Sequence, residues 1–137
     1  MHEITGSCLC GALTYTCSSE ALLTAVCHCK ACQKSTGSAF SVIVGVNKSD
    51  VTIAGNTLTT YEDIGDSGQA IYRHFCSKCG STIMAELAAR PDLACIKAGT
   101  LDHPEQFSPQ LHVYWRDHQE WIRALDALPK HDTILKK

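Results

Sequence analysis

The sequence predicts a mostly β protein that forms one domain over residues 1–137. Glycine and asparagine recur at short intervals, and the segments between them are short and rich in β-formers. In 39–46, Phe40, Val42, Val44 and Val46 occupy every second position, the period of a strand packed mainly on one face. A chain of this length can bury a core, and no repeat or long linker divides it.

The remaining elements are predicted from the same glycine and asparagine positions. In chain order, we expect strands at 12–17, 22–27, 39–46, 50–53, 70–75, 82–87, 93–98 and 111–115. Helical periodicity is weak, and it predicts single turns at 30–35 and 104–107 and a short stretch at 120–125.

Charge and hydropathy argue against nucleic acids and membranes as partners. The formal net charge is −2 and the pI is about 6.4, so we expect no nucleic-acid partner and no attraction to an anionic membrane. No stretch approaches the roughly 20 apolar residues that span a bilayer, and the N-terminus does not resemble an export signal. We therefore expect a cytoplasmic protein without a membrane segment.

Nine cysteines are unusual in such a protein. Disulfides are rare in a reducing compartment, where clustered cysteines more often bind metal, and an odd number argues against a complete disulfide framework. Seven of the nine fall into three groups, which are Cys8 and Cys10, then Cys27, Cys29 and Cys32, then Cys76 and Cys79.

Two of these groups predict one structural zinc site. Cys76 and Cys79 form a CxxC half-site followed by Gly80, whose tight turn directs both sulfurs toward one ion. Cys8 and Cys10 supply the other half, because residues i and i+2 of an extended segment point to the same side. Metal binding is worth on the order of 10–16 kcal/mol in zinc-finger peptides, which offsets the entropy of closing so long a loop.

The third group predicts a second zinc site with three protein ligands, Cys27, Cys29 and Cys32. Three ligands and one open position are typical of catalytic zinc, whereas closed sites with four ligands are structural. The alternative is a closed site, with the fourth ligand supplied by Cys17, Cys95, His28, His74 or His112. Cys17 and Cys95 are also interpreted as small buried hydrophobic residues, and His28 should point away from the metal.

An open site with three thiolates favours thiol chemistry. Its formal charge of −1 makes the ion a poor Lewis acid for activating water, whereas an exogenous thiol is a well-matched fourth ligand that coordination deprotonates. Cations near the ligands in sequence could neutralise the charge or bind an anionic thiol, namely Lys30, Lys34, Arg73 and Lys78. Hydrogen bonds and close backbone approach around the open position are expected from Gln33, Lys34, Ser35, Thr36 and Gly37.

Five segments resemble the glutathione-dependent formaldehyde-activating family, which includes proteins of the centromere protein V type. They are GSCLCGALTY, CHCKACQKSTGSAF, FCSKCGSTI, AGTLDHP and LHVYWRDHQEWIRALDALPKH, in the family's order and spacing over nearly the whole chain. The resemblance implies an Mss-four-like fold of coiled antiparallel β-sheets and two zinc ions. The structural ion would bind Cys8, Cys10, Cys76 and Cys79, and the catalytic ion would bind Cys27, Cys29 and Cys32, with the glutathione sulfur completing the second site.

The activity that the resemblance implies is that of a carbon–sulfur lyase of the S-(hydroxymethyl)glutathione synthase type. It joins a small-molecule thiol, glutathione, to a small aldehyde, formaldehyde. A different class is a noncatalytic zinc-stabilised binding module of the centromere protein V type, but the basic extensions expected of such a module are absent from this sequence. A redox protein using Cys76 and Cys79 is a third alternative, disfavoured because that motif usually opens a helix in a βαβ context.

Overall fold

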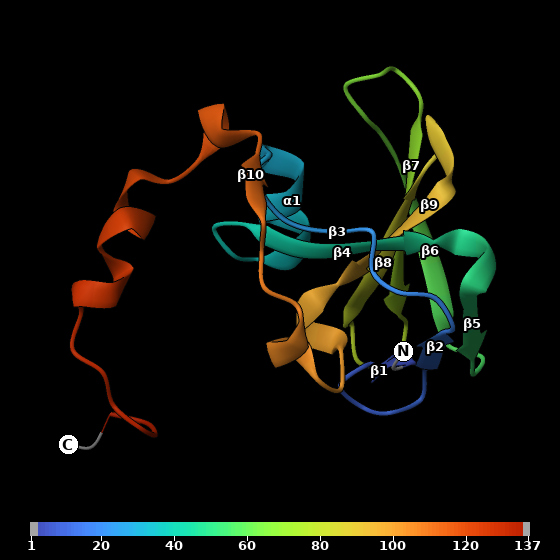
Figure 1. Ribbon diagram of the computed structural model, residues 1–137, viewed down its shortest axis with the longest axis horizontal. Coiled ribbons are helices and arrows are strands. Elements are labelled where there is room, and N and C mark those ends of the chain that lie inside the picture. Colours follow the sequence, from blue (N-terminus) through green and yellow to red (C-terminus); the bar gives the residue numbers. More distant parts are fainter. Residues whose placement is uncertain (1–2, 136–137) are drawn as a thin grey trace.

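The computed structural model describes residues 3–135, which form two β-sheets, one short α-helix and several 3₁₀ turns (Figure 1). The smaller sheet has the order β1-β2-β5, and the larger has the order β10-β3-β4-β9-β8-β7-β6. The smaller sheet contains β1 (Ile4–Ser7), β2 (Thr14–Cys17) and β5 (Val51–Ala54). The larger contains β3 (Leu23–Cys27), β4 (Ser41–Asn47), β6 (Leu58–Ile64), β7 (Ala70–Cys76), β8 (Thr82–Leu87), β9 (Arg90–Lys97) and β10 (Leu111–Val113).

The helical elements connect and follow these strands. The α-helix, α1 (Lys30–Thr36), joins β3 to β4 and ends at Gly37, whose φ of 66° is the left-handed conformation that glycine adopts most easily. The 3₁₀ turns are η1 (Lys48–Asp50), η2 (Ala98–Thr100), η3 (Pro104–Gln106), η4 (Trp115–Asp117) and η5 (Glu120–Ala127). Among the described residues, no helix has the length and apolar character needed to cross a membrane.

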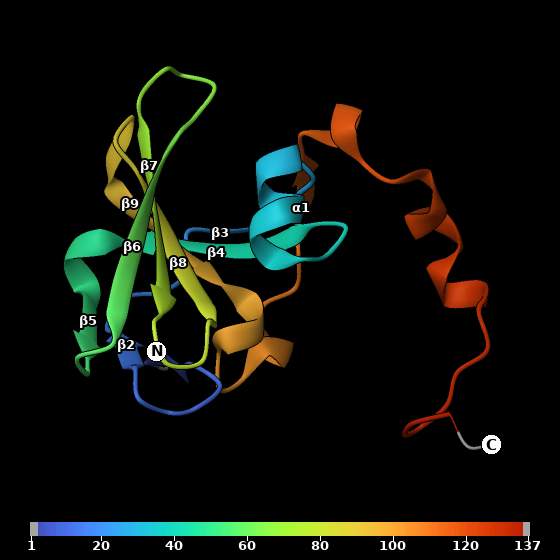
Figure 2. The same ribbon diagram turned by 180° about the vertical axis from the view of Figure 1, so that it is seen from behind.

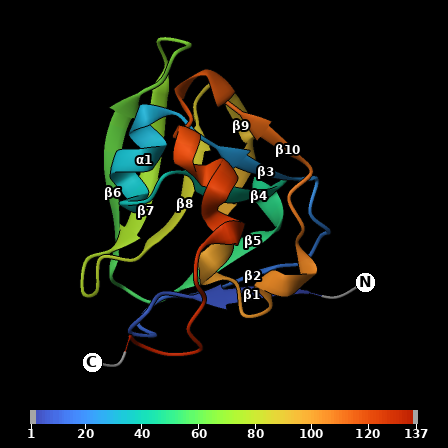
Figure 3. The ribbon, with the colours of Figure 1, turned by 90° about the vertical axis from the view of Figure 1, so that its left-hand side faces the viewer.

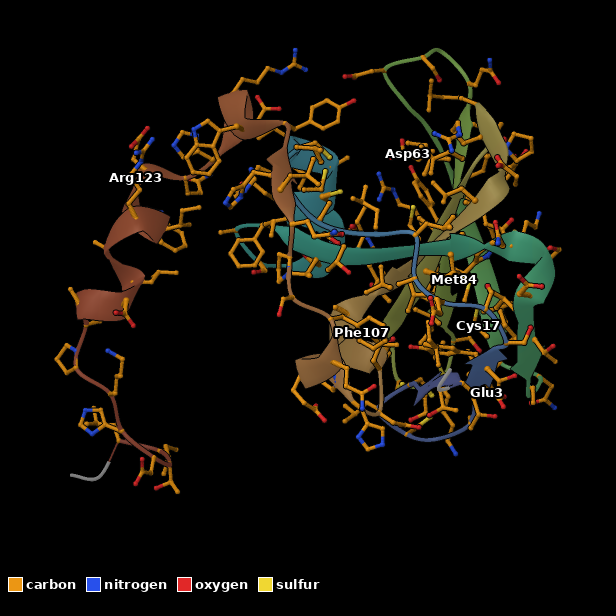
Figure 4. The ribbon with its side chains drawn as sticks, in the orientation of Figure 1. Glu3, Cys17, Asp63, Met84, Phe107 and Arg123 are labelled. Carbon is orange, nitrogen blue, oxygen red and sulfur yellow. The ribbon has the colours of Figure 1, made fainter. Side chains whose placement is uncertain are left out.

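The core lies between the two sheets and follows from strand alternation. In β4 and β9, even-numbered residues point toward the smaller sheet, and Val44, Val46 and Ile96 are fully buried there. The smaller sheet contributes Tyr15 and the neighbouring Leu13 to the same core. Cys17 and Met84 lie inside this core, with Phe107 packed against it (Figure 4). The odd-numbered face of the larger sheet is therefore free to form a different surface.

The chain after β9 returns to the opposite edge of the larger sheet. β10 pairs in parallel with β3, and Val113 lies opposite Cys27 in that register. Seen from behind, α1 lies on the same side of the molecule as η4 (Figure 2). Beyond η4 the chain leaves the sheets, and η5, with Arg123, extends away from them (Figures 1 and 4). Trp121 on η5 is 55% exposed, so this segment does not contribute to the core.

The mostly β class is confirmed, and the strands expected from the sequence are all present, with 82–87 matching β8 at both ends. Two strands, β1 and β6, were not predicted. The strand pairs are antiparallel, as expected, except that β10 runs parallel to its partner β3. The turns expected at 30–35, 104–107 and 120–125 correspond to α1, η3 and η5. That residues 1–137 form a single domain stays a prediction.

Candidate metal centres and cavity

Four of the thiols form one cluster between the smaller sheet and the β7–β8 turn. Cys8 and Cys10 follow β1, Cys76 ends β7 and Cys79 lies in the turn, and their sulfurs are all within 4.8 Å of one another. The Sγ atoms of Cys8 and Cys10 are 3.6 Å apart, and those of Cys10 and Cys76 are 3.8 Å apart. Tetrahedral zinc with Zn–S bonds of about 2.3 Å spaces its sulfurs about 3.8 Å apart, so these residues fit the ion.

Neighbouring hydroxyl groups favour the thiolate form of two residues in this four-thiol cluster. A hydrogen bond from Ser81 lowers the pKa of Cys79 to about 5, and the two side chains are 3.2 Å apart. A hydrogen bond from Thr57 lowers the pKa of Cys76 in the same way. The Ser81 hydroxyl also accepts from the backbone N–H of Leu9 at 2.9 Å. Ser81 therefore joins the N-terminal turn to the β7–β8 turn independently of any ion.

The other three thiols form a second cluster where β3 passes into α1. Cys27 is the last residue of β3, Cys29 is the N-cap of α1 and Cys32 lies inside the helix, and their sulfurs are within 4.8 Å of one another. Cys29 Sγ accepts a hydrogen bond from the backbone N–H of Cys32 at 3.2 Å. Two clusters of cysteine, one of four thiols and one of three, could therefore each bind a metal ion such as zinc.

The three-thiol cluster is also suited to thiolate formation. A hydrogen bond from Cys27 lowers the pKa of Cys32 to about 5 despite the burial of its side chain, and the nearby positive charges of Lys97 and Arg73 act in the same direction. The pKa of Cys27 is correspondingly raised by its hydrogen bond to Cys32, and burial raises the pKa of Cys29. These contacts favour the thiolate form of Cys32.

The residues considered as a fourth ligand lie elsewhere. His28 points to the other side of the strand, where its Nε2 is 2.8 Å from His112 Nδ1, so its predicted direction is confirmed. His74 is hydrogen-bonded to Thr60, and Cys17 lies in the core. Cys95, which is buried as expected, also stands outside both clusters. Within residues 3–135, the group of mutually close ligand atoms at this site contains three thiols.

A cavity of about 630 Å³ opens against the three-thiol cluster. Its floor is the odd-numbered face of the larger sheet, because the strand registers place Cys27, Ile43, Lys97 and Arg73 on that face. Apolar side chains line most of the floor, namely Ile43, Ile71, Ala85, Leu87, Leu93 and Val113. The mouth is charged, with Lys30, Asp66, Arg90, Arg116 and Asp117 around it. Such a cavity suits a small molecule with an apolar part and charged groups.

Two buried cations stand on this floor. Arg73 is 9% exposed and its Nε is 3.1 Å from Asp63 Oδ2, so a carboxylate balances its charge. Asp63 points to the side of the sheet on which α1 lies (Figure 4). Lys97 is 7% exposed, and its Nζ donates a hydrogen bond to Ser41 Oγ at 2.8 Å. Burial lowers the pKa of Lys97, while the thiolates of the cluster oppose that change.

The substrate contacts predicted on α1 face several directions. The Gln33 amide donates to the carbonyls of His28 and Asp117, at 2.7 and 3.1 Å, so it ties α1 to η4. The Thr36 hydroxyl donates to Cys32 O at 2.8 Å. Lys34 lines a second groove of about 550 Å³ next to Arg73. Together with Gly37, these residues do not line the 630 Å³ cavity, and their role in substrate binding stays a prediction.

The main functional candidate that sequence reasoning missed is Lys97. A lysine near the end of an apolar strand is usually interpreted as exposed. The sequence contains one signal that Lys97 faces the cavity, which is the alternation of side chains along a strand. Cys95 and Lys97 are two residues apart and therefore share one face of β9.

The chain is similar to one protein family in sequence and to a solved structure in fold. The family model described as "Glutathione-dependent formaldehyde-activating enzyme" matches residues 3–117, which include both clusters and every strand. No curated protein matches the chain. A crystal structure of a Rhodobacter sphaeroides protein is similar to 80% of this chain and 99% of that chain, with a TM-score of 0.62 and 20% sequence identity. At that identity, the likeness concerns the fold alone.

Proposed function

The chain belongs to the glutathione-dependent formaldehyde-activating family, and from that premise we propose that it binds a thiol at the three-thiol cluster and adds it to a small aldehyde. Glutathione or a similar thiol is the first substrate, and formaldehyde or another small aldehyde is the second. The product is an S-hydroxymethyl thiol adduct, which makes the protein a carbon–sulfur lyase of the S-(hydroxymethyl)glutathione synthase type. Cys8, Cys10, Cys76 and Cys79 would hold a structural zinc ion.

The observation that carries this proposal is the position of the three-thiol cluster at one end of the 630 Å³ cavity. Cys27, Cys29 and Cys32 would hold a second zinc ion, which when bound supplies the positive charge that keeps a fourth, exogenous thiol in its thiolate form. The buried side chains around the cluster exclude water from the ligand, and the cations at the mouth suit the carboxylates of a peptide thiol. The chain thus holds both reactants in one place.

The test compares the exchange rate between free and adduct forms of ¹³C-formaldehyde by NMR, with glutathione present. The wild-type chain should accelerate the exchange in proportion to its concentration. Cys29→Ser should abolish the acceleration, whereas Cys17→Ala, which removes a thiol outside both clusters, should retain it. Zinc content and titration of a cobalt-substituted sample with glutathione should show two metals per chain and a spectral change on adding thiol.

Two results would contradict the proposal. One is a wild-type chain with two bound metals that neither accelerates the exchange nor responds to thiol. That result would favour the noncatalytic binding module. The other is a Cys29→Ser variant that is as active as the wild type.

A further inference from the structure

Lys97 is a buried cation without a carboxylate partner. Within residues 3–135, no ion pair within 4.0 Å involves its Nζ, in contrast to Arg73, which pairs with Asp63. Burying a charged ammonium group is costly unless an opposite charge or a ligand compensates it. The three-thiol cluster is a source of negative charge near Lys97, because Cys27 lies opposite Ser41, the residue to which Lys97 donates its hydrogen bond, and Cys32 lines the same cavity. Its charge therefore belongs to the site rather than to the core.

The ammonium group also has more N–H donors than it uses in hydrogen bonds to the described residues. It carries three N–H bonds, and Ser41 Oγ is the one hydrogen-bond acceptor that it has in the described part of the chain. Ser41 lies opposite Cys27 in the β3–β4 register, and Lys97 lies opposite Ile43 on the next strand. The hydrogen bond to Ser41 consequently holds the head of Lys97 beside the end of β3, at the cluster end of the cavity. Its remaining donors are available to a molecule in that cavity.

This inference rests on the proposed function. We propose that Lys97 is the catalytic group that donates a hydrogen bond, and then a proton, to the aldehyde oxygen. The thiolate sulfur attacks the carbonyl carbon, a C–S bond forms, and the π electron pair moves to the oxygen. The Lys97 ammonium donates a hydrogen bond to this developing alkoxide and then gives it a proton, and the amine regains a proton from water. The thiol has released one proton on ionising, so thiol and aldehyde give the hydroxymethyl adduct with no change of oxidation state.

Tyr114 is the competing donor at this cavity. It lines the mouth, and its φ of 54° is unusual for a bulky residue. However, the Tyr114 hydroxyl donates its hydrogen bond to the carboxylate of Asp66, which raises the pKa of Tyr114 and leaves the hydroxyl without a free proton to donate. Its side chain is also 40% exposed, whereas Lys97 is 7% exposed. A donor in the water-excluded part of the site stabilises a developing oxyanion more strongly.

The experiment measures the rate of adduct formation, thiol affinity by calorimetry and zinc content in the full-length chain. Lys97→Met keeps the volume and removes the charge, and should lower the rate on the order of 10²-fold, as loss of one oxyanion donor does. Thiol affinity and zinc content should not change. Ser41→Ala keeps the lysine but removes its anchor, and should lower the rate on the order of fivefold. Lys48→Met, on η1 and outside the cavity, is the matched control and should retain the wild-type rate.

The possible failures are distinguishable. If the wild-type chain does not accelerate adduct formation, the proposed function fails and this inference fails with it. If the wild type is active and Lys97→Met is equally active, only the role of Lys97 is overturned. Loss of zinc or of thiol binding in Lys97→Met, in step with the rate, would show that Lys97 merely balances the charge of the thiols. Tyr114→Phe should retain most of the rate, and a larger loss there than in Lys97→Met would transfer the role to Tyr114.

Discussion

The two cysteine clusters should contribute very differently to stability, because they close loops of different length. Cys10 and Cys76 are 66 residues apart, whereas Cys27 and Cys32 are five residues apart. If a bound ion is treated as a cross-link, loop closure removes about 4 kcal/mol of unfolded-state entropy at the four-thiol cluster and about 2 kcal/mol at the three-thiol cluster. A domain is typically stable by only about 5–15 kcal/mol, so the first loss is a large part of the total.

The perturbation is the replacement of two ligands in each cluster by serine. Cys8→Ser/Cys10→Ser should lower the free energy of unfolding by at least about 4 kcal/mol, since the ion can no longer join the N-terminal turn to the β7–β8 turn. Cys27→Ser/Cys29→Ser should cost about 2 kcal/mol less than the first pair, because β3 and α1 remain held by the sheet and by the Gln33 hydrogen bonds.

Urea denaturation in saturating zinc, followed by circular dichroism, measures both losses. With slopes of about 1–3 kcal/mol per molar urea, the first pair should move the midpoint by more than 1 M. Zinc content measured in parallel should fall from two to one per chain in each variant. Equal losses of stability, or a larger loss at the three-thiol cluster, would refute the assignment of the four-thiol cluster as the structural site.

Two further predictions concern the fold around these sites. Burial raises the pKa of Tyr15 from 10.0 to about 12. As the pH rises, the unfolded chain therefore loses the phenol proton before the folded chain does. The free energy of unfolding should fall by up to about 3 kcal/mol between pH 10 and pH 12. Tyr15→Phe, which loses the 2.7 Å hydrogen bond to Thr100, should lack this decrease, and pH-dependent urea titrations of both chains would show it. Gly55→Ala should cost about 2 kcal/mol or more, because at φ 115° its Cβ would lie 2.2 Å from Ala12 O. Gly68→Ala, with positive φ and no atom within 4 Å, is the control, and an equal loss of thermal stability in both would remove the steric argument.

The sequence was sufficient for the cysteine groups because the spacing within each group is local, even where two groups distant in sequence meet in one cluster. A CxC pair on an extended segment and a CxxC turn direct their sulfurs without help from distant residues, and the two groups found in the structure are the groups expected from spacing. Most strands were predictable for the same reason, since apolar alternation is visible within four to eight residues. In β4, the alternation of Val44 and Val46 corresponds to full burial on the core face.

Other features depend on tertiary contacts and left weak local signals. β1 and β6 are short of apolar residues, and β6 forms an edge of the larger sheet, where one row of backbone groups has no strand partner. The parallel pairing of β10 with β3 joins segments that are more than 80 residues apart in sequence, as the contact of His28 with His112 shows. Alternation places Lys97 on the same face of β9 as Cys95, but the burial of Lys97 depends on the position of β9 between β4 and β8, which no local pattern specifies.

Strand alternation, with its period of two, also determines how the three-thiol cluster is positioned. At the end of β3, Cys27 and Cys29 point toward the cavity, and His28 between them points to the opposite side. There its ring is fully buried against the rings of Phe40, His112 and Trp115, so the residue between two ligands fixes the ligand segment to the edge strand β10. Figure 3 shows β10 beside β3 at this edge. Because this anchor lies on the far side of the strand, β10 is held against β3 while Val113 is its one described side chain that lines the cavity.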